Sequence, residues 1–344
     1  MRVIFVQRAA ALAAALFILG LQSANGAAAE DDGWLHRNCN TFTAEIENDL
    51  VQHSDRHYTH GTRFTCTQRD GSAPESASDS AAALGLFADG GHRRLALTLG
   101  QNIYTPNNLA AEDAPLTDRP YAGWLYGGVG MTSDTGVRYD ALELDLGIVG
   151  PQAYAKETQR LFHGIPAVHA RTKRPAGWSH QLKNEPGVVA TYDHVWRAVS
   201  EPVPLGLRAE ILPQGGAAVG NVFTHAEGGA MIRIGRNIPA DDYGPPLIRP
   251  SAPGSSPAGA DGFGWYVFAA AQERAVARNI FLDGNTFAHS RSVDKNTWVG
   301  DLSWGVVFTW DWARLALVEV YRTREFEGQE HPDSYGAMTL GIRF

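Results

Sequence analysis

Apolar and polar residues alternate along much of this chain, which is the pattern of β-strands rather than of helices. In residues 139–150, four aliphatic side chains fall on one face of the expected strand, whereas Glu143 and Asp145 fall on the other. Two carboxylates on one side of an apolar strand suit a water-filled lumen, with the aliphatic side toward lipid. The pattern therefore predicts a transmembrane β-barrel.

Similar segments recur along the chain, and the last one alternates again and ends on the aromatic residue Phe344. The expected strands cover residues 41–49, 58–67, 93–104, 121–133, 138–149, 188–199, 206–216, 221–235, 263–281, 294–310, 314–326 and 335–344. Their number is even, as a closed single-chain antiparallel barrel requires, and closure leaves no unpaired strand edge in lipid. We therefore predict an all-β fold, a twelve-stranded antiparallel transmembrane barrel in one domain.

The first residues have the order of a secretory signal peptide. Arg2 and Arg8 precede an apolar run over residues 9–21, and small residues follow as far as Ala29. The run is shorter than the stretch of about 20 apolar residues that spans a membrane as a helix. We expect residues 1–29 to be a signal peptide and residues 30–344 to form the outer-membrane barrel.

Three connections between the expected strands are long. Residues 71–91 and 239–262 are rich in Gly, Ser, Ala or Pro, which predicts flexible segments. The connection over residues 151–185 differs, because residues 153–162 contain no Gly or Pro and several good helix formers. With the mature N-terminus in the periplasm, strand parity places this short helix in an extracellular loop.

The net charge and the cysteine content indicate which partners and which compartment suit the chain. The formal net charge of −8 becomes −10 when Arg2 and Arg8 are removed, which argues against a nucleic-acid partner. Cys39 and Cys66 lie equally far from the tip of the first expected hairpin, so they could face each other. In an exported protein this permits one disulfide, although two isolated thiols fit the spacing equally well.

The tip of that first hairpin is a candidate site. Asn48 and Asp49 end one expected strand, and Thr59 lies on the next, within a segment rich in imidazole and hydroxyl groups. Oxygen-rich clusters of this kind suit a hard cation such as calcium. A polar extracellular turn without a ligand would have a similar composition.

The helix of the third long connection supplies a second candidate. Gln159 and His163 are four residues apart and share one helix face. A histidine is suited to deprotonate a water, and a glutamine one turn away can hold that water or a substrate carbonyl. A solvated helix face explains the pair equally well. Downstream, Trp178 and residues 181–185 either line the same site or anchor the loop.

Serine and zinc chemistry are not favoured, because the sequence contains neither a G-x-S-x-G nor an H-E-x-x-H motif. Several longer motifs are instead similar to those of the outer-membrane lipid A 3′-O-deacylase family. They are ENDL at 47–50, DRHYTHG at 55–61, LGQNIYTP at 99–106, DRPYAGWLY at 118–126 and GIVGPQA at 147–153, followed by Gly177-Trp178 and Gln181. The resemblance runs from about Phe42 to Glu185 and continues more weakly to Phe344.

The resemblance implies an outer-membrane barrel of twelve strands that depends on calcium and removes the 3′-linked acyloxyacyl chain of lipid A. The functional positions of the family fall on Asn48, Asp49, Thr59, Gln159 and His163, with calcium expected at Asn48 and Asp49. Members also carry a lysine in the second outer loop. Residues 105–118 contain none, and Arg119 is the nearest cation.

The sequence thus leads to the expectation of a carboxylic ester hydrolase that uses a histidine-activated water on lipopolysaccharide of the outer leaflet. Two alternatives stay open. One is a phospholipase-like esterase that applies the same residues to glycerophospholipids. The other is a channel or structural barrel without enzymatic activity, for which an open lumen would be required.

Overall fold

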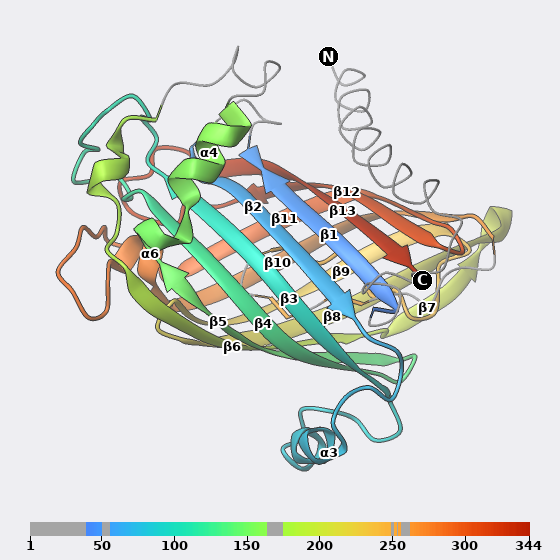
Figure 1. Cartoon of the computed structure of the whole chain (residues 1–344). Helices are drawn as coiled ribbons and strands as arrows, with labels where there is room; N and C mark the ends of the chain where they lie inside the picture. The colour runs from blue at the N-terminus through green and yellow to red at the C-terminus, as the bar shows by residue number, and fades with distance from the viewer. Residues whose placement is uncertain (1–38, 50–55, 164–174, 249–250, 253, 256–261) are drawn as a thin grey trace, which may run out of the picture. The chain divides into compact units, whose positions relative to one another are not determined.

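The computed structural model describes residues 39–49, 56–163, 175–248, 251–252, 254–255 and 262–344, except the side chain of His163. The expected signal peptide, residues 1–29, lies outside this part of the chain. The described residues form one continuous sheet of antiparallel strands that closes on itself (Figure 1). Among them, we find no helix long and apolar enough to cross a membrane.

The sheet contains 13 strand segments. They are β1 (Thr41–Asn48), β2 (His57–Thr67), β3 (His92–Thr105), β4 (Ala122–Asp134), β5 (Arg138–Val149), β6 (Glu185–Trp196), β7 (Val199–Val203), β8 (Leu207–Gly220), β9 (Phe223–Arg236), β10 (Gly264–Asn279), β11 (Trp298–Thr309), β12 (Ala313–Arg322) and β13 (Asp333–Arg343). β13 pairs with β1, which closes the barrel, and β6 and β7 pair in succession with the same strand, β8. β6 and β7 are therefore one interrupted strand, and the predicted barrel of twelve antiparallel strands is confirmed.

Short helices lie in the connections. They are α3 (Glu75–Ala83), η2 (Pro151–Ala153), α4 (Ala155–His163), η3 (Gly177–His180), η4 (Pro204–Gly206) and α6 (Ile280–Asp283). The helix predicted over residues 153–162 is present as α4, preceded by the 3-10 turn η2. The prediction of a wholly flexible segment over residues 71–91 was wrong, because α3 forms there.

α4 and α6 lie at one end of the barrel, whereas α3 and the C-terminus lie at the other (Figure 1). We call the first the loop end. It comprises the described residues of the connections that follow β1, β3, β5, β8, β10 and β12. Strand parity predicts that this end faces the cell exterior.

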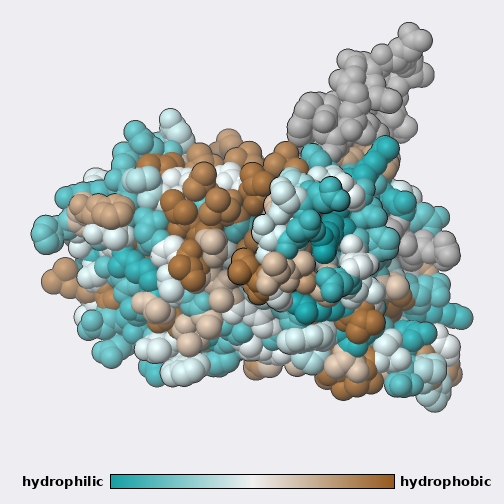
Figure 2. Space-filling model, turned by 90° about the horizontal axis from the view of Figure 1, so that it is seen from below, coloured by the Kyte–Doolittle hydropathy of each residue, from teal (hydrophilic) through white to brown (hydrophobic). Residues whose placement is uncertain are grey.

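The two faces of the wall differ in polarity as the alternation predicts. On β5, Leu144 and Leu146 are 46% and 56% exposed on the outer face, whereas Glu143 and Asp145 are buried on the inner face. Figure 2 shows hydrophobic residues gathered on the middle of one side of the molecule and hydrophilic residues toward its ends. An apolar outer wall of this kind is suited to contact lipid.

Part of the connection between β9 and β10 lies inside the lumen. We call residues 240–248 and 251–252 the plug segment. Its backbone donates from Ile248 N to Glu47 Oε1 (2.8 Å) and from Ala252 N to Asp193 Oδ2 (2.6 Å). The flexible segment predicted over residues 239–262 is therefore wrong for these residues, because hydrogen bonds to the inner wall hold them.

Asp242 is the most enclosed charged group of the plug segment. Its carboxylate lies 2.9 Å from Arg314 Nε and 3.3 Å from Arg233 Nη1, and it accepts a hydrogen bond from the Tyr266 hydroxyl at 3.0 Å. Burial alone would raise the pKa of the Asp242 carboxyl, but the guanidinium groups of Arg314 and Arg233 hold this pKa well below its ordinary value. Buried charges that are paired in this way attach the segment to three strands.

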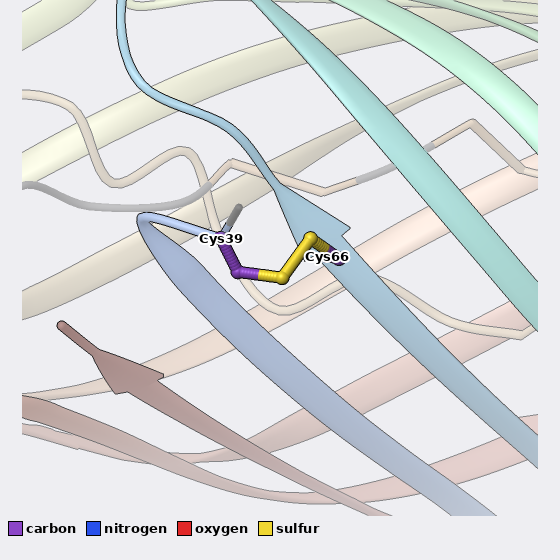
Figure 3. Close-up of a disulfide and its surroundings, with 2 residues drawn as sticks. All are labelled: Cys39 and Cys66. Atoms are coloured by element: carbon purple, nitrogen blue, oxygen red, sulfur yellow. A yellow bond between two sulfur atoms is a disulfide. The ribbon is translucent and has the colours of Figure 1, made fainter. Parts of the chain in front are cut away.

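The first hairpin is braced by a disulfide between Cys39 and Cys66, with a Cα–Cα distance of 5.3 Å (Figure 3). Cys39 stands just before β1 and Cys66 near the end of β2, so the bond crosses the hairpin where its two strands separate. Of the two states that the spacing left open, the structure contains the bridged one. The bond lies at the end of the hairpin opposite its tip.

Candidate active site

A short row of polar side chains lies on the outer face of the wall at the loop end. It consists of Asn48, His60 and Thr62, and we call it the polar row. The pairing of β1 with β2 determines this face: Glu47 lies opposite Gly61 and contacts the plug segment, so both positions face the lumen. Asn48 lies opposite His60, one residue along each strand, and both therefore face outward. Polar groups on the lipid side of a barrel wall are unfavourable unless they are paired or covered.

The row is connected by hydrogen bonds. Asn48 Nδ2 donates to the backbone oxygen of Thr59 at 3.0 Å and lies 3.3 Å from His60 Nδ1, and His60 Nε2 lies 2.7 Å from Thr62 Oγ1. Because the amide nitrogen is a donor only, His60 Nδ1 accepts and His60 Nε2 carries the proton that it donates to Thr62. Both amide hydrogens of Asn48 are thereby engaged, and its carbonyl oxygen is turned to the opposite side.

Asp49 and Thr59 complete the hairpin part of the site. Both are buried, and Asp49 Oδ2 accepts a hydrogen bond from the backbone nitrogen of Arg56. Thr59 lies at a β-bulge between Tyr58 and His60, and its hydroxyl is 2.6 Å from that of Thr105 on β3. The bulge turns Thr59 out of the regular alternation, and the threonine pair fixes its side chain.

α4 covers this part of the wall. Gln101 on β3 donates from Nε2 to the backbone oxygen of Ala153 at 2.6 Å. A Cβ atom on Gly123 would lie only 2.4 Å from the Cβ of Ala155, so glycine at that position allows the start of α4 to approach β4 closely. A small buried cluster outside the wall holds the loop in place, and we call it the outer cluster. It contains Ile103, Leu109, Tyr121, Ala155 and Trp178.

The helix brings its own candidate residues to the polar row. The Phe162 ring packs on the His60 ring, with centroids 4.4 Å apart. Gln159 lies one turn earlier, is only 2% exposed, and its Oε1 accepts a hydrogen bond from Trp178 Nε1 at 2.8 Å. His163 is the last residue of α4, next to Phe162, and its side chain lies outside the described part of the structure.

The five predicted site residues therefore come from two segments that meet outside the barrel wall. Asn48, Asp49 and Thr59 belong to the first hairpin, and Gln159 and His163 belong to α4. The contact between Phe162 and His60 joins the two segments, because His60 is bonded to Asn48.

Two further residues of this site were not selected from the sequence. His60 was included in the polar hairpin but had no assigned role, although its strand parity with Asn48 would have placed both on one face. Trp178 was left between a site residue and a loop anchor, and the structure shows that it bonds Gln159 and packs in the outer cluster.

Arg119, the cation nearest to the missing lysine, is not presented to the outer surface. It is fully buried, its Nη1 lies 3.1 Å from Glu325 Oε2, and its guanidinium group lies 4.9 Å from the centre of the Tyr104 ring. Arg119 is therefore a buried cation of the barrel interior that pairs with Glu325.

The hairpin tip has the chemistry for a hard cation. Asn48 and Asp49 offer amide and carboxylate oxygens, the donor types that calcium prefers. A calcium ion needs about 6–8 oxygen ligands. Among the described residues no group of three or more His, Cys, Asp or Glu side chains could hold a metal, so these two residues would supply only part of its shell.

A closed antiparallel barrel with an apolar outer face is the architecture of proteins that span an outer membrane. A family model described as outer membrane protein LpxR matches residues 12–344. The chain thus belongs to the LpxR family of outer-membrane proteins, which confirms the resemblance seen in its motifs. It is a multi-pass β-barrel of the outer membrane.

A solved structure agrees with this fold. LpxR from Salmonella typhimurium superimposes with a TM-score of 0.70 and 22% sequence identity, covering 88% of this chain and 100% of that one. The β domain of the Bordetella autotransporter BrkA matches with a TM-score of 0.43 and 12% identity over 88% of this chain and 97% of that one. The translocator domain of NalP from Neisseria meningitidis gives 0.33 and 11% over 98% of each chain. No curated protein sequence matches.

Proposed function

We propose that this protein is a lipid A 3′-O-deacylase, a calcium-dependent hydrolase that releases the 3′-linked acyloxyacyl chain from lipopolysaccharide in the outer leaflet. Membership of the LpxR family supports lipid A as the substrate. The proposal assigns the chemistry to the site between α4 and the outer wall.

The observation that carries the proposal is the side of the wall on which the polar row lies. A channel, or an enzyme for soluble substrates, would place its polar groups toward the lumen. Here Asn48 and His60 face outward, and α4 covers them. A lipid can reach that position by lateral movement in the membrane, without its acyl chains leaving the apolar phase.

In the proposed reaction His163 accepts a proton from water as the water oxygen forms a bond to the ester carbonyl carbon. The bond between that carbon and the sugar oxygen then breaks, and the proton passes to the sugar oxygen. The products are a free acyloxyacyl carboxylic acid and a 3′-hydroxyl group. Gln159 orients the ester, and Thr59 forms a hydrogen bond with the substrate or with a metal ligand.

Asn48 and Asp49 are proposed to hold the calcium ion. When bound there, calcium would supply positive charge beside the ester carbonyl, the kind of charge stabilisation that contributes most to many hydrolyses. The hydrogen bonds from Asn48 Nδ2 to Thr59 and to His60 keep the amide oxygen in one direction. Orientation of one ligand before the ion binds lowers the entropy cost of binding.

The test is mass spectrometry of lipid A from cells with and without the protein, each with and without a calcium chelator. We expect lipid A to lose one acyloxyacyl chain only when both the protein and calcium are present. Identical spectra in all four samples would contradict the proposal. Deacylation that persists in the chelator would contradict calcium dependence alone.

A second assay separates lipid A deacylation from the phospholipase-like alternative. In it, the purified protein is given glycerophospholipid vesicles and lipid A in parallel. Release of fatty acid from glycerophospholipid only would replace the proposed substrate. The channel alternative predicts conductance in a planar bilayer, which the plug segment and its bonds to Glu47 and Asp193 oppose.

A further inference from the structure

The side-chain amide of Gln159 has a defined orientation. Its acceptor atom lies 2.8 Å from Nε1 of Trp178, and both side chains are buried. An indole nitrogen can only donate a hydrogen bond, so the amide atom facing it must be oxygen. This removes the usual ambiguity between the oxygen and the nitrogen of a glutamine side chain.

The nitrogen of the same amide is consequently turned away from Trp178. Gln159 Nε2 is buried and has no hydrogen-bond partner among the residues that the structure describes. A buried donor without an acceptor is unfavourable, and a bound ligand is one source of the acceptor that it lacks. Gln159 lies three residues before Phe162, on the same face of α4, and Phe162 contacts His60 of the polar row.

Trp178 is held firmly enough to impose this orientation. Its ring packs on Tyr121 with centroids 4.8 Å apart, and its backbone oxygen accepts a hydrogen bond from Gln181 Nε2 at 3.1 Å. A Cβ atom at the preceding Gly177 would lie 2.6 Å from the Tyr121 ring, so the backbone there is closely packed. The indole is thus a fixed donor in the outer cluster.

We propose that Trp178 is a positioning residue that makes Gln159 a hydrogen-bond donor to the substrate ester. The inference rests on the proposed function and deepens it. As water adds to the ester carbon, the π electrons of the carbonyl move to its oxygen, and the N–H groups of Gln159 stabilise the resulting negative charge. The alternative role, in which Gln159 accepts a hydrogen bond from the attacking water, would need the second lone pair of the oxygen that already accepts from Trp178.

Two variants of Gln159 separate the roles. Gln159→Glu retains the shape and the acceptor atoms but loses the N–H donors, and Gln159→Ala removes both. Steady-state kinetics of the purified protein on lipid A with calcium should show that kcat falls about 10²-fold or more in both variants. Near wild-type kcat in Gln159→Glu would overturn the donor role.

Trp178→Phe tests the positioning role, because it keeps an aromatic ring and removes only the indole donor. We expect kcat to fall about tenfold with KM changed by less than about twofold, since one hydrogen bond is lost. The double variant Trp178→Phe with Gln159→Ala should be no slower than Gln159→Ala alone, because Trp178 acts through Gln159. Independent, multiplying losses would show a merely structural role and overturn the proposal.

Tyr121→Phe is the matched control. It removes the hydrogen bond from the Tyr121 hydroxyl to Leu109 O (3.0 Å) in the same cluster without touching Gln159. We expect it to retain wild-type kcat, and a loss equal to that of Trp178→Phe would contradict the inference. If wild-type protein does not deacylate lipid A at all, the proposed function fails; if wild-type is active and Trp178→Phe equals it, the positioning role alone fails.

Discussion

The inner and outer faces of this barrel wall hold polar groups for different purposes. In the lumen, opposite charges form ion pairs. Asp242 of the plug segment lies between Arg233 and Arg314. On the outer face, neutral amide, imidazole and hydroxyl groups form a hydrogen-bonded row beneath α4. Paired charges hold elements together, whereas neutral groups with fixed donor directions can orient a ligand. Paired charges thus stabilise the barrel from the lumen, and the outer wall is where we propose that the chemistry takes place.

Two histidines of β2 show the same division within one strand. His57 Nδ1 lies 2.7 Å from Asp333 Oδ2 on β13, and its ring packs against Phe326. His60, beyond the bulge, bonds Asn48 and packs against Phe162 of α4. One histidine thus joins the hairpin to the strand that closes the barrel, and the other joins it to the candidate site.

The largest expected effect is that of His163→Ala, which should lower the rate of lipid A deacylation about 10²–10⁴-fold, because a positioned base is lost. Glu143→Gln, on the lumen face, is the control and should retain activity. The measurement is product formation by mass spectrometry from equal amounts of folded protein. An inactive Glu143→Gln beside an active His163→Ala would reverse the assignment of the two faces.

Asp242→Asn should lower stability strongly and leave the chemistry intact. Removing the charge leaves the buried Arg314 without its carboxylate partner, whereas Arg233 keeps Glu210, and breaking a buried ion pair lowers the free energy of unfolding by about 3–5 kcal/mol. The urea midpoint of the folded barrel, followed by electrophoretic mobility, should fall. An unchanged midpoint would show that the plug segment is not held by this ion pair.

The pH dependence of stability provides the control for this variant. The pKa of the Asp242 carboxyl is lowered in the folded protein, so its contribution is present above the unfolded value of about 3.9 and is lost as the pH falls toward the folded value. Wild-type stability should decrease below about pH 4. Asp242→Asn should lack the part of this decrease that comes from Asp242.

Replacing Cys39 and Cys66 by Ser should lower the free energy of unfolding by about 2–4 kcal/mol. The disulfide closes a loop between residues 27 apart and thereby restricts the unfolded chain. The bond lies at the other end of the hairpin from Asn48, so deacylation by the folded variant should stay at the wild-type rate. Reduction of the wild-type protein should reproduce the loss of stability. A matching loss of activity would mean that the brace also shapes the site.

The smallest expected effect comes from His60. His60→Ala should lower kcat about five- to tenfold, since it removes one hydrogen bond that orients the Asn48 amide. His60→Gln keeps an acceptor near Asn48 and should recover part of the rate. His57→Gln, on the inner side of the same strand, should reduce stability more than kcat. Equal losses of kcat in His60→Ala and His60→Gln would contradict a positioning role for His60.

Much of the fold was predictable because alternation is a local property. The strand over residues 138–149 was predicted with the bounds of β5, and the even number of strands followed from the repeated pattern. The plug segment was not predictable, because its Pro- and Gly-rich composition is typical of flexible loops. Its order comes from partners far along the chain, such as Arg314 for Asp242.

The candidate site was predictable in part. Helical spacing places Gln159 and His163 on one side of α4, and the motifs indicate Asn48, Asp49 and Thr59. Neither spacing nor motif indicates that Phe162 rests on His60, or that Trp178 turns the amide of Gln159. These contacts join segments whose separation along the chain carries no periodic pattern.

The sequence by itself determined which residues alternate, where the strands lie to within a few residues, and which family the chain resembles, because each depends on neighbours in the chain. The tertiary structure decided that the candidate site lies outside the wall, that the plug segment enters the lumen, and which way the buried amide of Gln159 faces. Those features depend on how connections fold back onto a closed barrel. Only the packing of distant side chains selects among the directions that a loop can take.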